Sequence, residues 1–235
     1  MATNGDYVGN IKKTEHARVN KILLGPIERP ILQWLAKRMP PWVTPDLLTA
    51  IGFIATIITA ASYILCHRNT GFLWLANFGI LLNWFGDSLD GTLARYRKIE
   101  RPNYGFFIDH AMDGLGEVIV MMGIGLSPFV DFRVALITLV GYMLMANLVY
   151  IITYVKGEFR ISYLGLGPTE VRVILILTNI LVFMFGNPII DTKYGNFSAY
   201  NVVLVVIAVL LYVIYMVVTY INAKALAKLE GGTKK

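Results

Sequence analysis

The sequence has few charged residues and almost no cysteine. Asp, Glu, Lys and Arg make up 15% of the 235 residues, against about 25% in an ordinary soluble domain. So little charge argues against a soluble globular protein. The single cysteine, Cys66, excludes an intrachain disulfide and leaves the redox compartment open. We expect Cys66 to be an ordinary residue at a helix end.

The chain is instead rich in hydrophobic residues, which make up 56% of it. Several runs approach the roughly 20 residues that cross a bilayer as a helix. Their continuity favours helices over the alternating ten-residue segments of a membrane β-barrel. The sequence predicts an all-α integral membrane protein with six transmembrane helices, over 46–66, 72–95, 105–126, 133–155, 170–190 and 199–222.

Positive charge is distributed unevenly about these spans. Of the 21 Lys and Arg residues, three fall on the side opposite the termini, namely Arg68, Arg133 and Lys193. Because cytoplasmic loops carry the excess of Lys and Arg, we expect both termini in the cytoplasm. The net charge of +6 fits contact with anionic membrane lipids. The basic residues flank apolar runs and form no solvated basic face, so no nucleic-acid partner is expected.

A short segment before the first span has helical amphipathicity. Apolar residues lie on one face and basic residues elsewhere, as shown by Ile27, Ile31, Trp34 and Leu35 against Arg29, Lys37 and Arg38. This pattern predicts a short interfacial amphipathic helix, with a soluble linker as the alternative. We expect a cytoplasmic N-terminal segment (1–44), a six-helix catalytic domain (45–223) and a cytoplasmic tail (224–235).

Four carboxylates lie in or beside segments that otherwise resemble lipid-embedded helices: Asp87, Asp90, Asp109 and Asp113. A charge near the hydrocarbon core costs roughly 2.5–3.5 kcal/mol, and four of one sign need cations between them. Asp87 and Asp90 are three residues apart and Asp109 and Asp113 four apart, so each pair shares a helix face. The short connection over 96–104 predicts two antiparallel neighbouring helices whose acidic pairs face each other. Hard oxygen ligands of this kind predict a magnesium, manganese or calcium site.

Small residues and an arginine are interleaved with these acids. Gly91 and Ala94 leave the helix bare, so that a flat or bulky ligand can reach its backbone. Arg95 can hold a phosphate or pair with a carboxylate, and a side chain at Gly105 would crowd the same gap. Small residues in membrane helices also serve as packing contacts, so the ligand interpretation depends on their interleaving with the acids.

The complete pattern is Asp87-x-x-Asp90-Gly91-x-x-Ala94-Arg95, nine residues, then Gly105-x-x-x-Asp109-x-x-x-Asp113. It resembles the signature of the CDP-alcohol phosphotransferase family at every fixed position. The resemblance implies a membrane enzyme of phospholipid synthesis. Such an enzyme transfers a phosphatidyl or phospho-head-group unit from a CDP-linked donor (CDP-diacylglycerol or a CDP-alcohol) to the hydroxyl of an alcohol or lipid acceptor. CMP is released, and the family usually forms homodimers.

The resemblance also implies roles for individual residues. Asp87, Asp90 and Asp109 would bind one or two Mg²⁺ or Mn²⁺ ions, with Asp113 as a further ligand and the general base. His110 is the alternative base, because choline and ethanolamine members of the family resemble this chain in having His after the third Asp. The CDP pocket would comprise Asp87, Asp90, Gly91, Ala94, Arg95 and Gly105.

A second polar cluster lies between the fourth and fifth spans. In family members that bind a phosphorylated acceptor, basic residues in comparable places hold its phosphate, which implies that role for Lys156, Arg160 and Arg172. The alternative is three positive-inside charges, with Arg172 paired to Glu170 or Glu158. Thr169 has the character of a helix N-cap. Glu117, one turn beyond Asp113, either contacts the acceptor or is a neutral carboxyl bonded to backbone.

Two other functions compete with this interpretation. An intramembrane cation transporter uses buried acids, but the fourth to sixth spans carry ionisable residues almost only near their ends. A prenyl-transfer enzyme also binds diphosphates through Asp-rich magnesium sites, but it lacks the interleaved Gly, Ala and Arg. Binding of a cytidine nucleotide with metal distinguishes the phosphotransferase from both.

Overall fold

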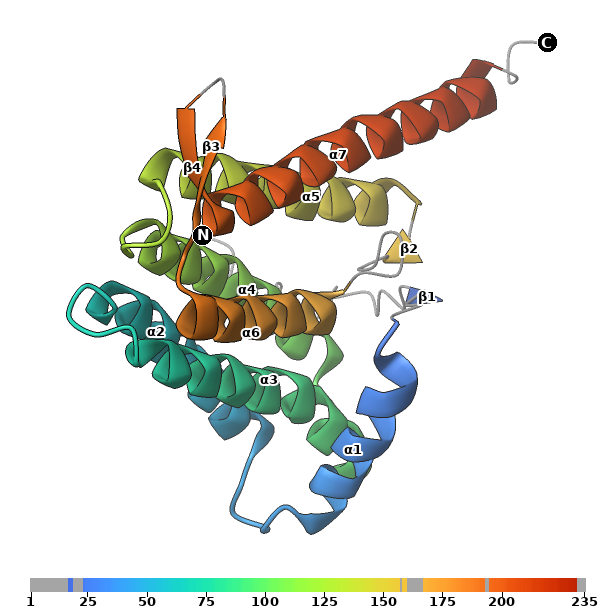
Figure 1. Ribbon diagram of the computed structural model, residues 1–235. Helices are drawn as coiled ribbons and strands as arrows, with labels where there is room; N and C mark the ends of the chain where they lie inside the picture. Colours follow the sequence, from blue (N-terminus) through green and yellow to red (C-terminus); the bar gives the residue numbers. More distant parts are fainter. Residues whose placement is uncertain (1–16, 19–22, 157, 160–166, 193–194, 232–235) are drawn as a thin grey trace, which may run out of the picture.

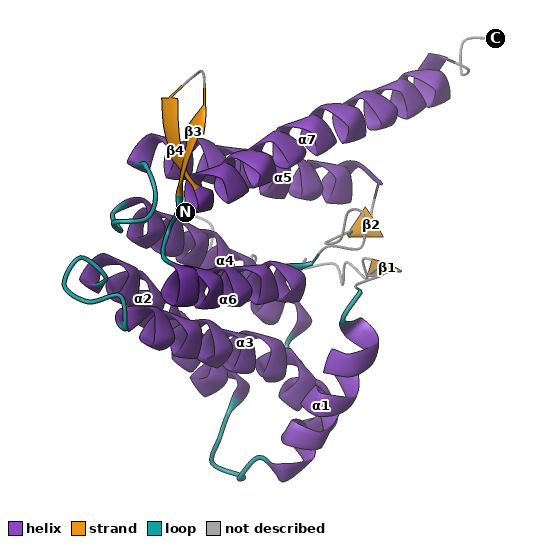
Figure 2. Ribbon diagram, in the orientation of Figure 1, coloured by secondary structure: helices purple, strands orange, loops and turns teal. Residues whose placement is uncertain are grey.

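The computed structural model describes residues 17–18, 23–156, 158–159, 167–192 and 195–231. This part of the chain is nearly all helical (Figure 2). Its helices are α1 (Gly25–Arg38), α2 (Pro45–Leu65), α3 (Phe72–Arg97), α4 (Pro102–Gly125), α5 (Phe132–Lys156), α6 (Pro168–Phe185) and α7 (Ala199–Gly231). Helices α2 to α7 correspond one by one to the six predicted apolar segments.

Two short strand pairs depart from the all-α expectation. β1 (Ala17–Arg18) pairs in parallel with β2 (Glu158–Phe159). β3 (Ile189–Thr192) pairs antiparallel with β4 (Gly195–Ser198), with Ile189 opposite Ser198. The predicted helix over 170–190 is therefore wrong at its end. Gly186 has a φ of +76°, a backbone conformation that favours glycine and ends α6.

Among the described residues, four helices are long and apolar enough to cross a membrane: α2, α5, α6 and the Ala199–Glu230 part of α7. Helices α3 and α4 lie outside this set. They are 26 and 24 residues long, which exceeds the length needed to span. Their acidic and basic residues lower their hydropathy instead.

Helix α2 is the centre of the packing, since both α3 and α4 lie against it. Gly86 of α3 allows a close approach, because a Cβ there would lie 2.5 Å from the Leu48 carbonyl oxygen of α2. Within the described chain, α3 and α4 themselves have almost no close backbone contact. The expectation that they pack as neighbours is wrong, because both pack against α2.

The remaining helices pack around this trio. Helix α1 crosses the end of α3, α6 lies along α3, and α5 lies beside α7 (Figure 1). A core of Leu32, Ala36, Val43, Leu48, Leu89 and Leu93 joins α1, α2 and the C-terminal part of α3. A larger core around Tyr63, Ile124 and Leu204 lies toward the opposite end of the bundle. The four acids lie toward the first of these ends, which we call the acidic end.

Candidate active site

The four predicted acids come from two helices, Asp87 and Asp90 from α3, Asp109 and Asp113 from α4. Asp90 is buried, with 6% of its surface exposed, whereas Asp87 and Asp109 are half-buried and Asp113 is exposed. The charges of Asp87, Asp90 and Asp109 all act on Asp113, and those of Asp87 and Asp109 act on Asp90. The four carboxylates therefore form one electrostatic group, although their helices are not packed together.

Arg172 of α6 is a cation that reaches this group. Its Nη2 donates to Asp87 Oδ2 at 2.6 Å, and its Nε donates to Asn83 Oδ1 at 3.0 Å. Asn83 is held in turn by α2, because its Nδ2 donates to the carbonyl of Gly52 and to Thr56 Oγ1, both at 3.1 Å. Arg172 thus pairs with Asp87 rather than with Glu170.

Asp90 is bound by two donors other than a cation. Thr49 Oγ1 of α2 donates to Asp90 Oδ2 at 2.5 Å, and the Gly91 backbone N–H donates to Asp90 Oδ1. A Cβ at Gly91 would lie 3.3 Å from Arg95 Nη1, so this glycine leaves room for the arginine. Arg95 Nη2 donates to Thr92 Oγ1 at 3.3 Å.

Two of the predicted CDP-pocket residues are small and lie on either side of the α3–α4 connection. Ala94 is half-buried on α3. Gly105 is also half-buried, but a Cβ added there would have no atom within 4 Å. The space beside Gly105 is open in the protein, so the expectation that a side chain there would crowd a bound ligand stays a prediction.

The ring of His110 contacts α5. Its Nδ1 lies 2.6 Å from the carbonyl oxygen of Phe106. Because a carbonyl only accepts, Nδ1 carries the proton and Nε2 has the lone pair in the neutral ring. The imidazole stacks on Phe106 at 4.1 Å between centroids and meets the edge of Tyr150 at 5.7 Å.

The half-buried Glu117 lies where the charge of Arg172 acts on it.

The start of α6, which carries Arg172, is attached to α1 and α3. The buried Glu170 accepts from the backbone N–H groups of Leu24 at 2.8 Å and Gly167 at 2.9 Å. Glu28 of α1 accepts from Trp84 Nε1 at 2.7 Å and from Thr169 Oγ1 at 2.9 Å. Gly167 is the N-cap of α6, so the expectation of an N-cap at Thr169 is wrong.

The other two basic residues of the predicted acceptor group are placed differently. Lys156 Nζ donates to Asn222 Oδ1 at 2.6 Å, which connects the end of α5 to α7. Arg160 lies outside the described residues. The structure therefore brings Arg172 to the acids but gives Lys156 a partner on another helix.

A cavity of about 270 Å³ lies between α2 and α4 next to the acids. Its lining is Asp46, Thr49, Ala50, Phe53, Tyr104, Ile108 and Met112. Thr49 joins this cavity to Asp90. Arg101 pairs with Asp46 and lies 4.1 Å from the centroid of the Tyr104 ring. Sequence reasoning missed this α2 wall, because Thr49 is 41 residues from Asp90 and no local pattern connects them.

The four acids of the site are candidate ligands of a divalent cation. In the part of the chain that the structure describes, no three His, Cys, Asp or Glu side chains converge closely enough to hold a metal ion. The Asp87 carboxylate accepts a hydrogen bond from Arg172, and the Asp90 carboxylate accepts one from Thr49. The chemistry of the donor set nevertheless fits, since carboxylates grouped with one sign of charge are what hard divalent cations select.

In the described residues, fold and site together define a helical protein with four helices apolar enough to cross a membrane and a group of four carboxylates at one end. The chain belongs to the CDP-alcohol phosphatidyltransferase family, whose family model matches residues 42–227.

Curated relatives include enzymes with different substrates. Chicken cholinephosphotransferase 1 is 26% identical over 195 residues, which are 78% of this chain and 56% of that protein. Archaetidylinositol phosphate synthase of Pyrococcus horikoshii is 28% identical over 140 residues, which are 57% of this chain and 67% of that protein. The chain thus spans little more than half of the chicken enzyme. The names of these relatives differ in substrate, so they leave the substrates of this chain open.

A solved structure supports the fold. The crystal structure of Mycobacterium tuberculosis phosphatidylinositol phosphate synthase with CDP-DAG bound matches with a TM-score of 0.56 at 19% identity. The match covers 81% of this chain and 90% of that chain.

Proposed function

We propose that this protein transfers a phospho-alcohol unit from a CDP-linked donor to an acceptor hydroxyl and releases CMP. The observation that carries the proposal is the group of four carboxylates from α3 and α4, reached by Arg172, in a chain of this family. A ligand that carries a diphosphate together with divalent cations would balance the like charges of this group. The donor is CDP-diacylglycerol or a CDP-alcohol, and the acceptor is an alcohol or a lipid.

The reaction assigns a step to the chain's own acids. The acceptor oxygen attacks the phosphorus that bears the alcohol, a new P–O bond forms, and the P–O bond to CMP breaks. Asp113 is the proposed general base that takes the hydroxyl proton, because it is the exposed member of the group and can meet an incoming substrate. His110 is the alternative base through Nε2, since its Nδ1 proton is held by Phe106.

The divalent metal fits the same residues. Asp87, Asp90, Asp109 and Asp113 are the proposed ligands of one or two Mg²⁺ or Mn²⁺ ions. A bound metal would neutralise the donor diphosphate and make CMP a better leaving group. Asp90 is held for this task by Thr49, and Asp87 by Arg172.

Donor and acceptor sites lie on different sides of the acids in this proposal. The CDP unit would contact Asp87, Asp90, Gly91, Ala94, Arg95 and Gly105, with the cavity between α2 and α4 beside it. Arg172 and Glu117 are the proposed acceptor residues, and the charge of Arg172 acts on Glu117, which supports a common role. Lys156 and Arg160 complete the acceptor group only as a proposal from the family resemblance.

The arrangement in the membrane follows from the same argument. We propose six spans, α2 to α7, with both termini and the acids on the cytoplasmic side. Exposed apolar residues support an interfacial α1, since Ile27, Ile31 and Trp34 face away from the core that holds Leu32 and Ala36. The N-terminal segment (1–44), catalytic domain (45–223) and tail (224–235) divide the chain accordingly, and the family pattern favours a homodimer.

The decisive experiment measures CMP release by purified protein in detergent with Mg²⁺. CDP-diacylglycerol, CDP-choline and CDP-ethanolamine are compared, each with a panel of alcohol and lipid acceptors. Release with one donor–acceptor pair, abolished by EDTA, identifies the reaction and its substrates. No release with any pair, together with no binding of cytidine nucleotides, would overturn the enzyme and favour the cation-transport alternative.

A further inference from the structure

One guanidinium at the acidic end binds an entire turn of the backbone. Arg97, in the last turn of α3, donates to four carbonyl oxygens: those of Val43 at 2.5 Å, Pro40 at 2.7 Å, Met39 at 3.2 Å and Pro41 at 3.4 Å. These residues form the turn between α1 and α2. Arginine has five N–H donors in a fixed planar fork, a geometry that no other side chain provides.

The turn has two backbone hydrogen bonds of its own, from the Met39 N–H to the Ala36 carbonyl at 3.4 Å and from the Val43 N–H to the Pro40 carbonyl at 3.1 Å, and the Val43 side chain is buried in the core. Its two prolines have no N–H group, and the carbonyls at the end of α1 have no helical partner. Met39 is half-buried and Val43 is buried, so their carbonyls need donors, and the half-buried Arg97 supplies them while it also binds the exposed Pro40 and Pro41. The guanidinium therefore helps to fix where the chain leaves α1 and where α2 begins.

The beginning of α2 forms the wall of the proposed donor site. Directly after the turn, Thr44 caps α2 by accepting from the Leu47 N–H at 3.2 Å. One turn further, Thr49 donates to Asp90, and Asp46 and Thr49 both line the cavity between α2 and α4. A displacement of the turn is thus transmitted to the contact with Asp90 and to the cavity wall.

We propose that Arg97 is a positioning residue for the CDP-linked donor. It touches no substrate, and it sets the first turns of α2 against the acids through the four carbonyls. The inference depends on the proposed function, because it assigns the α2 wall to the donor. Arg95, two residues earlier, faces the glycine beside Asp90 instead, so the two arginines of this segment have different tasks.

The test is Arg97→Lys, with Arg133→Lys as the matched control. Lysine keeps the charge but has no fork, so it can hold only part of the turn. We expect the KM for the CDP-linked donor and the Kd for CMP, measured by calorimetry, to rise about tenfold. The KM for the acceptor should stay within about twofold, because Arg172 lies on another helix. Arg133 is exposed, and its guanidinium bonds Asp131 beside it at the start of α5, so its variant should resemble wild type.

Other outcomes decide against the inference. An unchanged Kd for CMP, or equal rises in both KM values together with a lower melting temperature, would mean that Arg97 is merely structural. If Arg97→Lys does not fold, Arg97→Gln is measured in the same way, because its amide still donates to part of the turn. Wild-type protein that binds no CMP would overturn the proposed function as well, whereas normal wild-type binding with a normal variant overturns only the role of Arg97.

Discussion

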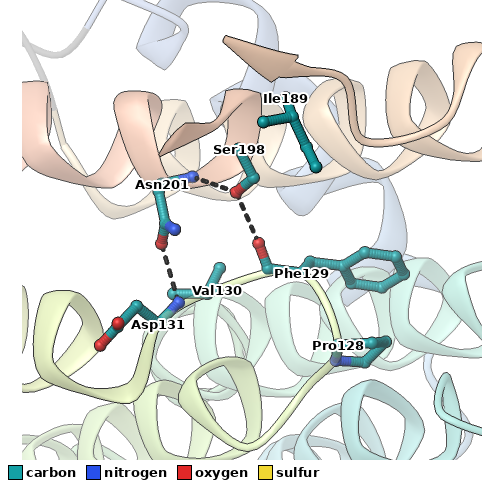
Figure 3. A pocket seen from close by; sticks show the side chains of 7 residues that line it. All are labelled: Pro128, Phe129, Val130, Asp131, Ile189, Ser198 and Asn201. Atoms are coloured by element: carbon teal, nitrogen blue, oxygen red, sulfur yellow. Dashed lines mark hydrogen bonds between the residues drawn. The ribbon is translucent and has the colours of Figure 1, made fainter. Parts of the chain in front are cut away.

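At the end of the bundle where α4 passes into α5, the polar groups around one cavity have complementary partners. Ser198 Oγ donates to the Phe129 carbonyl at 2.8 Å, and Asn201 Oδ1 accepts from the Asp131 N–H at 2.8 Å (Figure 3). This cavity of about 280 Å³ is lined by Pro128, Phe129, Val130, Asp131, Ile189, Ser198 and Asn201. At the acidic end, by contrast, four carboxylates of one sign gather with Arg172.

The same contrast holds for the interior. Asn179 accepts from Tyr63 Oη at 3.0 Å and Tyr200 Oη at 3.1 Å, and donates to Asn77 Oδ1 at 2.8 Å. All four side chains are buried. A network whose donors match its acceptors specifies how helices pack and needs no ligand. Like charges that the protein only partly compensates indicate a place where a ligand completes the structure.

The largest effect is expected from Asp113→Asn, which tests the acidic side of this contrast. CMP release should fall about 10³-fold, because the variant lacks the base. The melting temperature should not fall, since one of four repelling charges is removed. Activity assays and thermal unfolding on one preparation measure both. Asp131→Asn, at the opposite end, is the control and should keep its activity. A variant with more than a tenth of wild-type activity would point to His110 as the base.

The variant Asn179→Ala tests the buried network of matched donors and acceptors. It leaves the hydroxyls of Tyr63 and Tyr200 and the amide of Asn77 without their common partner. We expect a loss of about 3 kcal/mol in the free energy of unfolding, with activity per folded molecule close to wild type. Thr178→Ala is the matched control, since Thr178 Oγ1 bonds only its own helix at the Ile174 carbonyl in the described contacts. Loss of activity without loss of stability would contradict the structural role.

Arg172→Lys is expected to have an intermediate effect. Lysine keeps the charge but cannot hold Asn83 and Asp87 at once with a planar fork. The KM for the acceptor should rise about tenfold, while the KM for the donor changes little. Lys156→Met is measured beside it, because Lys156 binds Asn222. An equal acceptor defect in both variants would mean that Lys156 belongs to the site.

The local parts of this site could be predicted from the sequence. The spacing of the acids within each helix determines which faces they share, and apolar length locates the helices. Asn83 could also have been found, because it lies four residues before Asp87 on the same face. The packing of α3 and α4 on α2 could not, since it depends on close contacts with another helix, such as that of Gly86 with Leu48.

The partners of long-range hydrogen bonds could not be predicted from the sequence either. Glu170 lies in the first turn of α6, yet it also binds the Leu24 N–H, which is 146 residues away. The four carbonyls that Arg97 binds lie 54 to 58 residues before it. Hydrogen bonds of this kind depend on tertiary geometry, and a single sequence has no periodicity that indicates them.

The smallest effect is expected from Asp131→Asn, read as a pH dependence at the end opposite the acids. Hydrogen bonds from Arg133 lower the pKa of Asp131 from 3.8 to about 2. A carboxyl with a lowered pKa stabilises the fold fully above its unfolded value and loses that contribution as pH falls through the folded value. Wild type should therefore melt slightly higher than the variant at pH 7, and the difference should vanish between pH 4 and pH 2. Because the pair is exposed and screened by salt, the difference should also shrink at high ionic strength. A difference that disappears already near pH 6 would assign it to groups other than Asp131.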